Sequence, residues 1–391
     1  MTTTSSRHGD GVGRRGAQRS VSRARSLRTG GARPARALAG PAGVVQRIGQ
    51  VAGLATVEPV VEGAASAAPT ATASAAVRAW LIQNPAAGQD SWDAQVRAAT
   101  SALRAAGWDV TVRRTARPGD ATTFARQAVG AGCDVVVVAG GDGTVHEALQ
   151  GLAGQRRTAL AVLPGGTVNV WATELGVTGH QAAIAREIAR GRRQAVDLGR
   201  VNDRYFLMMA SAGFDAAANA EVAGSLRRLK RWAGIVPYAI SALATALRFR
   251  GQAVVLNIDG ETIASRLLMV VAGNTRLYGG IAEITYQARA DDGLLDVCVL
   301  TGRGPLDLAR RLWSVLRRRQ YADPAIVYRK ARRVVLDPVL PLRVQADGED
   351  IGLTPATFSV VPGALEVIVR ADVPPGFLGE PEDAVTGERP A

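Results

Sequence analysis

The chain has 391 residues, enough for two domains that each bury a hydrophobic core. Its formal net charge is +13, and residues 1–76 supply more than half of that, with ten arginines against three acidic residues. The rest of the chain is only mildly basic, so the composition indicates no specific nucleic-acid partner.

Cysteines and histidines are few and scattered. Cys133 and Cys298 belong to no CxxC or Cys/His cluster, and the three histidines lie far apart in the chain. This spacing excludes the usual zinc sites and a disulfide framework. We therefore expect a reducing, cytoplasmic setting.

Residues 1–76 form an Arg/Ala-rich tail that is too poor in large apolar residues to offset the entropy of folding, which predicts disorder. The letters GVGRRG (11–16) match a dinucleotide fingerprint, but neither a strand nor a helix flanks them, so the match carries no function. The nearest candidate for a membrane span, residues 233–249, is interrupted by Pro237 and is shorter than the roughly 18 residues that a span needs. It predicts a buried or interfacial helix.

From residue 77 the hydrophobic pattern alternates between the periods of strands and helices. The predicted strands cover residues 76–82, 109–115, 134–139 and 159–163. The predicted helices cover residues 91–106, 120–129 and 145–152. Such alternation is typical of a parallel sheet with helices on both faces, and ligands bind such sheets at the carboxyl ends of the strands.

Four loops follow those strands: NPAAG (84–88), Thr115 with its neighbours, GGDGT (140–144) and PGGTVN (164–169). Glycines let the backbone approach a polyphosphate, and the start of the next helix adds a positive dipole end. Asp142 would be repelled by bare phosphate, which indicates a bridging cation such as Mg²⁺. Any one of these loops alone is also compatible with an ordinary glycine-rich turn.

The chain lacks a Walker loop, because neither of its two lysines follows a glycine. GGDGT also occurs in NAD kinases, so this pentapeptide predicts a phosphate site without naming the substrate. Taken in order, however, the motifs of residues 77–372 resemble the diacylglycerol kinase catalytic family, which includes sphingosine kinases and bacterial lipid kinases. The motifs are NPAAG, GGDGTVHEAL, LPGGTVNVWA, VDLGRV, FLMMASAGFDA, VAGNTRLYGG, ARADDGLLDV and VQADGEDIGLTPATFSVVPGAL.

The resemblance implies a doubly wound α/β nucleotide-binding domain (77–194) followed by a β-rich antiparallel sandwich domain (195–372), with the active site in the cleft between them. It leaves 373–391 as a C-terminal tail, and the last strand can return to the first domain. The β-branched runs and Asp-Gly turns in residues 253–274 and 332–352 independently favour antiparallel strands.

The resemblance also implies the ligands and the residues that hold them. ATP with Mg²⁺ is the expected cofactor, and Asn169 would lie near the phosphoryl acceptor. The expected ATP contacts are Asn84, Thr115, Gly140, Gly141, Asp142, Gly143, Thr144, Val145, His146 and Thr167.

Two carboxylates are candidates for the general base. The Asp-Gly-Glu turn at 347–349 resembles the catalytic motif of the family, with Glu349 in the general-base position, while sphingosine-kinase-like members use the aspartate that corresponds to Asp142. The same letters occur at 259–261, and a plain hairpin turn is the alternative interpretation of either copy. The residues on both sides of 347–349 resemble the family, which favours that copy.

A second magnesium site is implied by ARADDGLL (288–295), which resembles the structural metal loop of bacterial lipid kinases. Matching by position assigns the Asp292 carboxylate and the backbone carbonyls of Arg289 and Leu294. A turn before a strand is the simpler interpretation.

A lipid kinase without a membrane span must meet its substrate at the bilayer surface. The segment 305–320 places Leu308, Leu312, Val315 and Leu316 on one helical face with arginines elsewhere, and 226–240 combines cations with Trp232 and Tyr238. A core helix with a solvated basic face explains the same pattern. Peripheral membrane association of a cytoplasmic protein is the expectation, and a homodimer is left open.

The predicted function is an ATP-dependent lipid kinase. Val170 stands where the family often has a second acid, and Ala87 where serine is usual, which leaves diacylglycerol, a sphingoid base and phosphatidylglycerol open as acceptors. The alternatives are a NAD-kinase-like kinase of a soluble acceptor and a catalytically silent nucleotide- or lipid-binding regulator.

Overall fold

The computed structural model describes residues 76–88, 91–225, 244–280, 282–370, 373 and 376–379. The predicted disordered tail, except Ala76, lies outside the described residues, as do the basic segment 226–240 and most of the apolar stretch 233–249.

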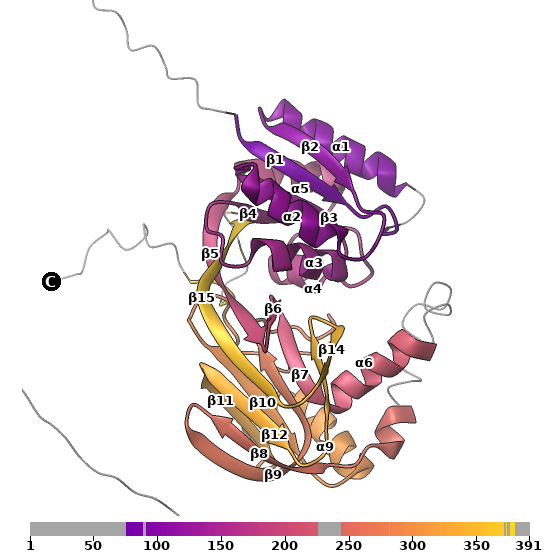
Figure 1. Cartoon of the computed structure of the whole chain (residues 1–391), viewed down its shortest axis with the longest axis vertical. Helices are drawn as coiled ribbons and strands as arrows, with labels where there is room; N and C mark the ends of the chain where they lie inside the picture. Colours follow the sequence, from indigo (N-terminus) through magenta and orange to yellow (C-terminus); the bar gives the residue numbers. More distant parts are fainter. Residues whose placement is uncertain are drawn as a thin grey trace, which may run out of the picture. The chain divides into compact units, whose positions relative to one another are not determined.

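The first domain is a parallel sheet in the order β4-β3-β1-β2 (Figure 1). Its strands are β1 (Arg78–Gln83), β2 (Asp109–Arg114), β3 (Val135–Gly140) and β4 (Ala159–Pro164). Its helices are α1 (Trp92–Ala105), α2 (Asp120–Gly130), α3 (Asp142–Leu152), α4 (Val170–Glu174) and α5 (Gln181–Arg190). The predicted alternation is confirmed, except that α3 begins at Asp142, three residues before the predicted start.

Helices cover both faces of this sheet because β3 is apolar on both sides. Val136 and Val138 pack with residues of α2 and α3, whereas Val135 and Val137 pack with residues of α1 and α5. Continuous apolar strands of this kind are typical of parallel sheets. All four strands end at the same edge, which is where the four predicted loops lie.

The second domain is β-rich and antiparallel, as predicted. Its strands are β5 (Arg192–Val201), β6 (Arg204–Phe206), β7 (Met209–Gly213), β8 (Gln252–Ile258), β9 (Glu261–Gly273), β10 (Leu295–Thr301), β11 (Ile326–Ala331), β12 (Arg333–Pro338), β13 (Arg343–Ala346), β14 (Glu349–Leu353) and β15 (Ala356–Val369). Among the described residues, the helices α6 (Phe214–Ser225) and α9 (Pro305–Leu316) accompany them, and residues 244–248 are helical as well.

Strand β15 belongs to both domains. It pairs with β12 and β5 in the β-rich domain, and its residue Val367 pairs in parallel with Leu160 of β4. Beyond it, Phe377 and Leu378 are buried in the core of the first domain, so the segment expected as a tail contributes two packed side chains. The ring centroids of Phe377 and Trp171 lie 5.6 Å apart, in an edge-to-face arrangement.

Helix α9 is amphipathic, but its apolar residues do not all share the face that the sequence predicts. Leu308 and Val315 are buried against the β-rich domain, whereas Leu316 is 59% exposed. Leu306 and Trp313 are exposed as well, so α9 shows apolar side chains on a second, outward face. Among the described residues, no helix is long and apolar enough to cross a membrane.

Candidate active site

The loop between β3 and α3 leaves backbone amides open at a helix start. Gly141 precedes α3 in an extended conformation (φ −90°, ψ −179°) and caps the helix with no side chain. The first amides of a helix have no acceptor within it and carry a partial positive charge. This start of α3 therefore suits an anion such as a phosphate group.

Glycines are required where this loop meets the next one. A Cβ atom on Gly141 would lie 3.1 Å from Cα of Gly166, and a Cβ atom on Gly166 would lie 2.8 Å from Cα of Gly141. A Cβ atom on Gly140 would lie 2.7 Å from the hydroxyl oxygen of Thr144. The GGDGT and PGGTVN loops thus touch through their backbones, as predicted for loops at one sheet edge.

The polar residues of the other loops converge on the same edge. Asn84 donates from Nδ2 to the hydroxyl of Thr144 at 2.9 Å, which joins the first and third loops. Thr115 follows β2, and its amide donates to the carbonyl of Gln83 at 2.9 Å. Thr167 is exposed at the fourth loop.

Trp92 is a residue of this region that the sequence analysis did not assign to the site. A Cβ atom on Gly88 would lie 2.8 Å from the Trp92 ring, and a Cβ atom on Gly165 would lie 2.4 Å from it, so the ring packs directly against both glycines. Its Nε1 donates to the carbonyl of Asn84 at 3.0 Å. Trp92 thus supports two of the loops from beneath, and only its position at the start of a helix after NPAAG hinted at this.

Asn169 and Asp142 are both held by backbone groups. The side-chain amide of Asn169 makes two hydrogen bonds of 2.8 Å with the backbone of Gly166. Its Oδ1 accepts from the Gly166 N–H, and its Nδ2 donates to the Gly166 carbonyl. Asp142 Oδ2 accepts from the amide of Val170 at 3.0 Å, at the start of α4. Burial raises the pKa of the Asp142 carboxyl, and its bonds to backbone amides oppose that rise.

The turn between β13 and β14 brings Glu349 to the GGDGT loop (140–144), called the phosphate loop below because its open amides suit an anion. Asp347 (φ 47°) and Gly348 (φ 86°) make the turn, and Glu349 opens β14. Its Oε1 lies 3.6 Å from where a Cβ atom on Gly143 would be. Glu349 is exposed, so its carboxylate stands free beside the GGDGT loop.

Asp347 fixes this turn. Its side chain is fully buried and accepts hydrogen bonds from the amides of Leu207 (2.8 Å), Met208 (2.9 Å) and Met209 (3.0 Å). Its Oδ2 also lies 3.1 Å from Nδ1 of His146, which is buried on α3. His146, predicted as an ATP contact, therefore joins the phosphate-loop helix to the turn that carries Glu349.

A buried polar network supports the same turn. Ser211 and Gln345 both donate to Oδ2 of Asp215, at 2.5 and 3.1 Å, and Oε1 of Gln345 accepts from the amide of Gly348 at 2.7 Å. Burial raises the pKa of Asp215 to about 6, against the lowering effect of these two donors. An acid inside the apolar run FLMMASAGFDA was the only sequence signal for this network.

The second Asp-Gly-Glu turn shows what distinguishes the two copies. Asp259 (φ 48°) and Gly260 (φ 93°) form the same kind of turn, and Asp259 accepts from the amides of Arg332 and Arg333. There, however, Glu261 forms an ion pair with Arg329 at the surface, with Nη2 of Arg329 donating to Oε1 of Glu261 at 3.1 Å. The turns are alike, and only the one at 347–349 meets the phosphate loop.

A buried acid also connects α4 to the β-rich domain. Glu174 is 1% exposed and accepts from the backbone amides of Arg276 (2.7 Å) and Leu277 (2.6 Å) and from the guanidinium of Arg276 (2.9 Å). A Cβ atom on Gly280 would lie 2.4 Å from Cγ1 of Val168. The 274–280 segment therefore packs against the PGGTVN loop, which the sequence did not reveal.

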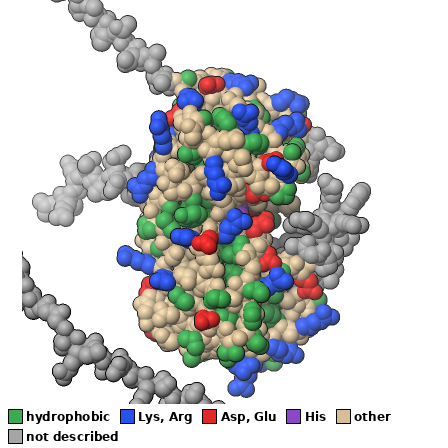
Figure 2. All heavy atoms as spheres, in the orientation of Figure 1, with side chains coloured by type: hydrophobic (Ala, Val, Ile, Leu, Met, Phe, Trp, Pro, Cys, Tyr) green, Lys and Arg blue, Asp and Glu red, His purple; other side chains and the backbone are tan. Residues whose placement is uncertain are grey.

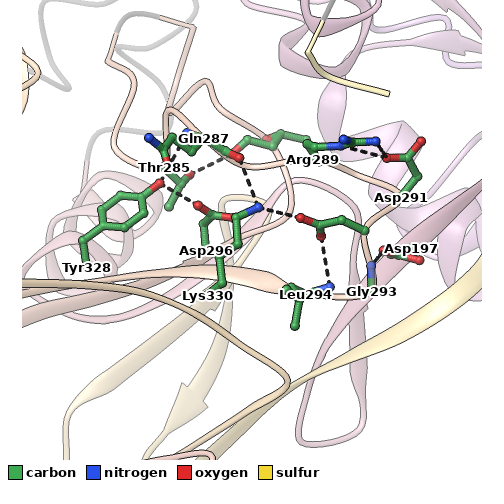
Figure 3. Close-up of polar contacts among 12 residues, drawn as sticks. Asp197, Thr285, Gln287, Arg289, Asp291, Gly293, Leu294, Asp296, Tyr328 and Lys330 are labelled. Carbon is green, nitrogen blue, oxygen red and sulfur yellow. Dashed lines mark hydrogen bonds and ion pairs between the residues drawn. The ribbon is translucent and has the colours of Figure 1, made fainter. Parts of the chain in front are cut away.

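The predicted structural magnesium loop has its carboxylate already engaged. Asp292 Oδ1 accepts from the amide of Leu294 at 3.1 Å, and Oδ2 contacts Nζ of Lys330 at 2.5 Å (Figure 3). The side chain of Arg289 turns to Asp291, at 3.2 Å. Among the described residues, no cluster of three or more His, Cys, Asp or Glu side chains is arranged to hold a metal ion.

Both parts of the chain match known family models. Residues 78–201 match the diacylglycerol kinase catalytic domain, and residues 208–369 match the YegS C-terminal NAD kinase beta sandwich-like domain. Diacylglycerol kinases of Staphylococcus aureus (strain bovine RF122 / ET3-1) and Staphylococcus carnosus (strain TM300) are each 27% identical over 297 residues, which cover 76% of this chain and 93% and 96% of theirs.

Two solved structures are similar to this chain over about three quarters of its length. A candidate diacylglycerol kinase from Bacillus anthracis str. Sterne is 28% identical with a TM-score of 0.65, covering 76% of this chain and 99% of its own. A diacylglycerol kinase from the same strain shares the fold at 24% identity and a TM-score of 0.60, covering 77% and 99%. With its two domains in this order and GGDGT at the sheet edge, the chain belongs to the diacylglycerol kinase catalytic domain family, with a YegS-like C-terminal domain.

Proposed function

We propose that this member of a lipid-kinase family transfers the γ-phosphate of ATP to a lipid hydroxyl, with Glu349 as the general base. The observation that carries the proposal is the proximity of the Glu349 carboxylate to Gly143 of the GGDGT loop. The carboxylate lies beside Gly143, in the first turn of the helix whose open amides suit a phosphate group. An exposed carboxylate next to a phosphate site is placed to take a proton from a hydroxyl that attacks there.

In the proposed transfer, bonds change only in ATP, the acceptor hydroxyl and the Glu349 carboxylate. The acceptor hydroxyl oxygen forms a bond to the γ-phosphorus, the bond from that phosphorus to the β–γ bridging oxygen breaks, and the hydroxyl proton passes to Glu349 while ADP leaves. Asp142 fits a magnesium ligand, since it is a half-buried carboxylate in the phosphate loop. Mg²⁺ there would neutralise charge on the phosphate oxygens.

The acceptor we propose is a lipid at a membrane surface, diacylglycerol or a related lipid with a free hydroxyl. The named relatives are diacylglycerol kinases, which supports this class of acceptor. Val168 and Gly280 lie on the two segments that meet beside the phosphate loop, and Val168 is 40% exposed, so an apolar side chain is available next to the site.

Helix α9 offers the surface that would meet the bilayer. Leu306 and Trp313 lie two helical turns apart and are both exposed, and Leu316 follows one turn later. Arg310 and Arg317 lie on the same side, with the guanidinium of Arg317 over the Trp313 ring at 4.5 Å. On the face drawn in Figure 2, basic side chains are spread among acidic ones and do not form one continuous patch. An exposed tryptophan beside arginines suits an anionic lipid interface.

The test is transfer of labelled γ-phosphate from ATP to a panel of diacylglycerol, a sphingoid base, phosphatidylglycerol and NAD. We expect a lipid product from the wild type and a kcat about 100-fold lower for Glu349→Gln, which keeps the shape and removes the base. Glu261→Gln is the matched control, because it alters the same position of the equivalent turn, and its kcat should not change.

Each other outcome selects a different function. Labelled NAD with no labelled lipid would show a kinase of a soluble acceptor. ATP binding with no product from any acceptor would indicate a regulator. Equal losses of kcat in Glu349→Gln and Glu261→Gln would show that Glu349 is not the general base.

A further inference from the structure

A lysine amine contacts the carboxylate that the family resemblance assigns to a structural magnesium ion, Asp292. Nζ of Lys330 lies 2.5 Å from Oδ2 of Asp292 and 3.4 Å from both the carbonyl of Gln287 and Oδ2 of Asp296 (Figure 3). Two carboxylates and one carbonyl therefore surround the ammonium group. These are the hard oxygen donors that Mg²⁺ also prefers.

The donors do not fit Mg²⁺ while Lys330 is in place. Both oxygens of Asp292 are engaged, one by the amide of Leu294 and one by Lys330. A magnesium ion bound to Oδ2 would lie about 2.1 Å from that oxygen, and therefore within a few ångströms of Nζ. Two positive charges so close in a partly buried site repel each other strongly, so only one of them can use this oxygen.

The sheet fixes Lys330 in this position. Lys330 on β11 is the cross-strand partner of Asp296 on β10, within six paired residues of an antiparallel ladder. Asp296 is 1% exposed and needs charge compensation inside the protein. The hydroxyl of Tyr328 donates to its Oδ1 at 2.8 Å, and Lys330 faces its Oδ2.

The composition of the chain makes this lysine unusual. Only two of its 47 basic residues, Lys230 and Lys330, are lysines, and the others are arginines. An ammonium group is a compact point charge with three donors, whereas a guanidinium is planar and extends further. A site with three oxygens around one nitrogen suits the ammonium group, as it suits a small metal ion.

The loop that Lys330 holds is tied to the strands that join the two domains. The amide of Gly293 donates to Oδ2 of Asp197 on β5 at 2.6 Å, and the amide of Gly363 on β15 donates to Oδ1 at 2.8 Å. Ordering of the 287–294 loop therefore stabilises the pairing of β5 with β15.

We infer that the Lys330 ammonium is a built-in cation that takes the place of a divalent metal in the 287–296 segment, so that this loop orders without Mg²⁺. The inference rests on the oxygens around Nζ and is independent of the proposed kinase reaction.

The first test measures Tm of the full-length chain without nucleotide, in EDTA and in Mg²⁺, for the wild type and for Asp292→Asn. We expect the same Mg²⁺-induced shift in both proteins, to within about 1 °C. A site at Asp292 filled by Mg²⁺ at 100 times its Kd would add roughly 5 °C to the wild type alone. A shift that appears in the wild type and disappears in Asp292→Asn would overturn the inference.

The second test replaces the ammonium with a neutral side chain of similar length. Lys330→Met should lower Tm in EDTA, and Mg²⁺ should then raise its Tm more than that of the wild type, by an increment that Asp292→Asn removes. Arg329→Met is the matched control, because it is the neighbouring residue of β11 and its ion pair with Glu261 is exposed. An unchanged Tm in Lys330→Met, or no extra response to Mg²⁺, would contradict a shared cation site.

Discussion

His146 and Asp347 lie 201 residues apart in the chain and contact each other at 3.1 Å, between the phosphate-loop helix and the turn that carries Glu349. Both side chains are almost fully buried, at 5% and 0% exposure. The contact spans the two domains at the point where the proposed base meets the phosphate loop. The placement of Glu349 therefore depends on the buried side chain of Asp347 and its contact with His146.

Asp347→Asn should therefore destabilise the protein and slow phosphoryl transfer. The asparagine retains one acceptor oxygen, but its amino group would face the donors of Leu207 and His146. We expect a loss of about 2 kcal/mol in the free energy of unfolding, measured by urea denaturation, together with a lower kcat.

The matched control for this prediction is Asp259→Asn, because Asp259 caps the equivalent turn at the surface. It should leave kcat unchanged and cost less stability. Equal effects of the two substitutions would show that burial and the contact with His146 are unimportant.

Gly141→Ala should weaken ATP binding with little effect on folding. The conformation of Gly141 is open to alanine, but the new Cβ atom would press on Gly166 and separate the two glycine loops. We expect the KM for ATP to rise roughly tenfold, which corresponds to about 1.4 kcal/mol.

Gly130→Ala provides the comparison, because a Cβ atom there meets no heavy atom within 4 Å and the residue is helical. Its KM for ATP should equal that of the wild type. If Gly141→Ala also left the KM for ATP unchanged, close approach of the loops would not be needed to bind the nucleotide.

Asp215 should make the protein less stable as the pH rises. The pKa of this buried acid is raised to about 6 in the folded state, so its stabilising contribution is complete below its unfolded value near 3.8 and is lost as the pH rises through 6. The difference corresponds to roughly 3 kcal/mol.

Asp215→Asn should remove this dependence, because a single amide oxygen can still accept from Ser211 and Gln345. We expect the variant to gain stability relative to the wild type between pH 4 and 7, as measured by urea denaturation over that range. A constant difference between the two proteins at all pH values would show that Asp215 does not titrate in this way.

Removal of the exposed apolar residues of α9 should reduce binding to anionic vesicles. The double variant Leu306→Ser and Trp313→Ser removes apolar area without changing the charge, so co-sedimentation with phosphatidylglycerol vesicles should fall roughly tenfold. Val255→Ser changes an exposed residue of β8 and should bind like the wild type. Undiminished binding of the double variant would exclude α9 as the membrane contact.

The sequence predicted those features whose causes are local. The alternation of strands and helices follows from hydrophobic periodicity. The glycine loops were recognisable from their runs of glycine, and the close approach of Gly141 and Gly166 explains why glycine is needed there. The turns at 259–261 and 347–349 were predictable from their Asp-Gly pairs. The two turns are equivalent locally, and the sequence favoured 347–349 only through the family motif around it. The fold adds that Glu349 lies close to Gly143.

Long-range contacts account for the rest. The packing of Trp92 under two loops, the pairing of Glu174 with Arg276 and the network around Asp215 all join residues that no local pattern relates. Lys330 is a similar case, because the ladder of β10 and β11 places its ammonium at a loop whose resemblance to a family motif implied a metal site.

The most direct test of the account is a crystal structure with Mg²⁺ and a non-hydrolysable ATP analogue. We predict the γ-phosphate at the start of α3, contacting backbone amides of the GGDGT loop, with the Glu349 carboxylate on the side from which the acceptor attacks. A triphosphate bound away from that loop, or a γ-phosphate shielded from Glu349 by protein atoms, would contradict the account.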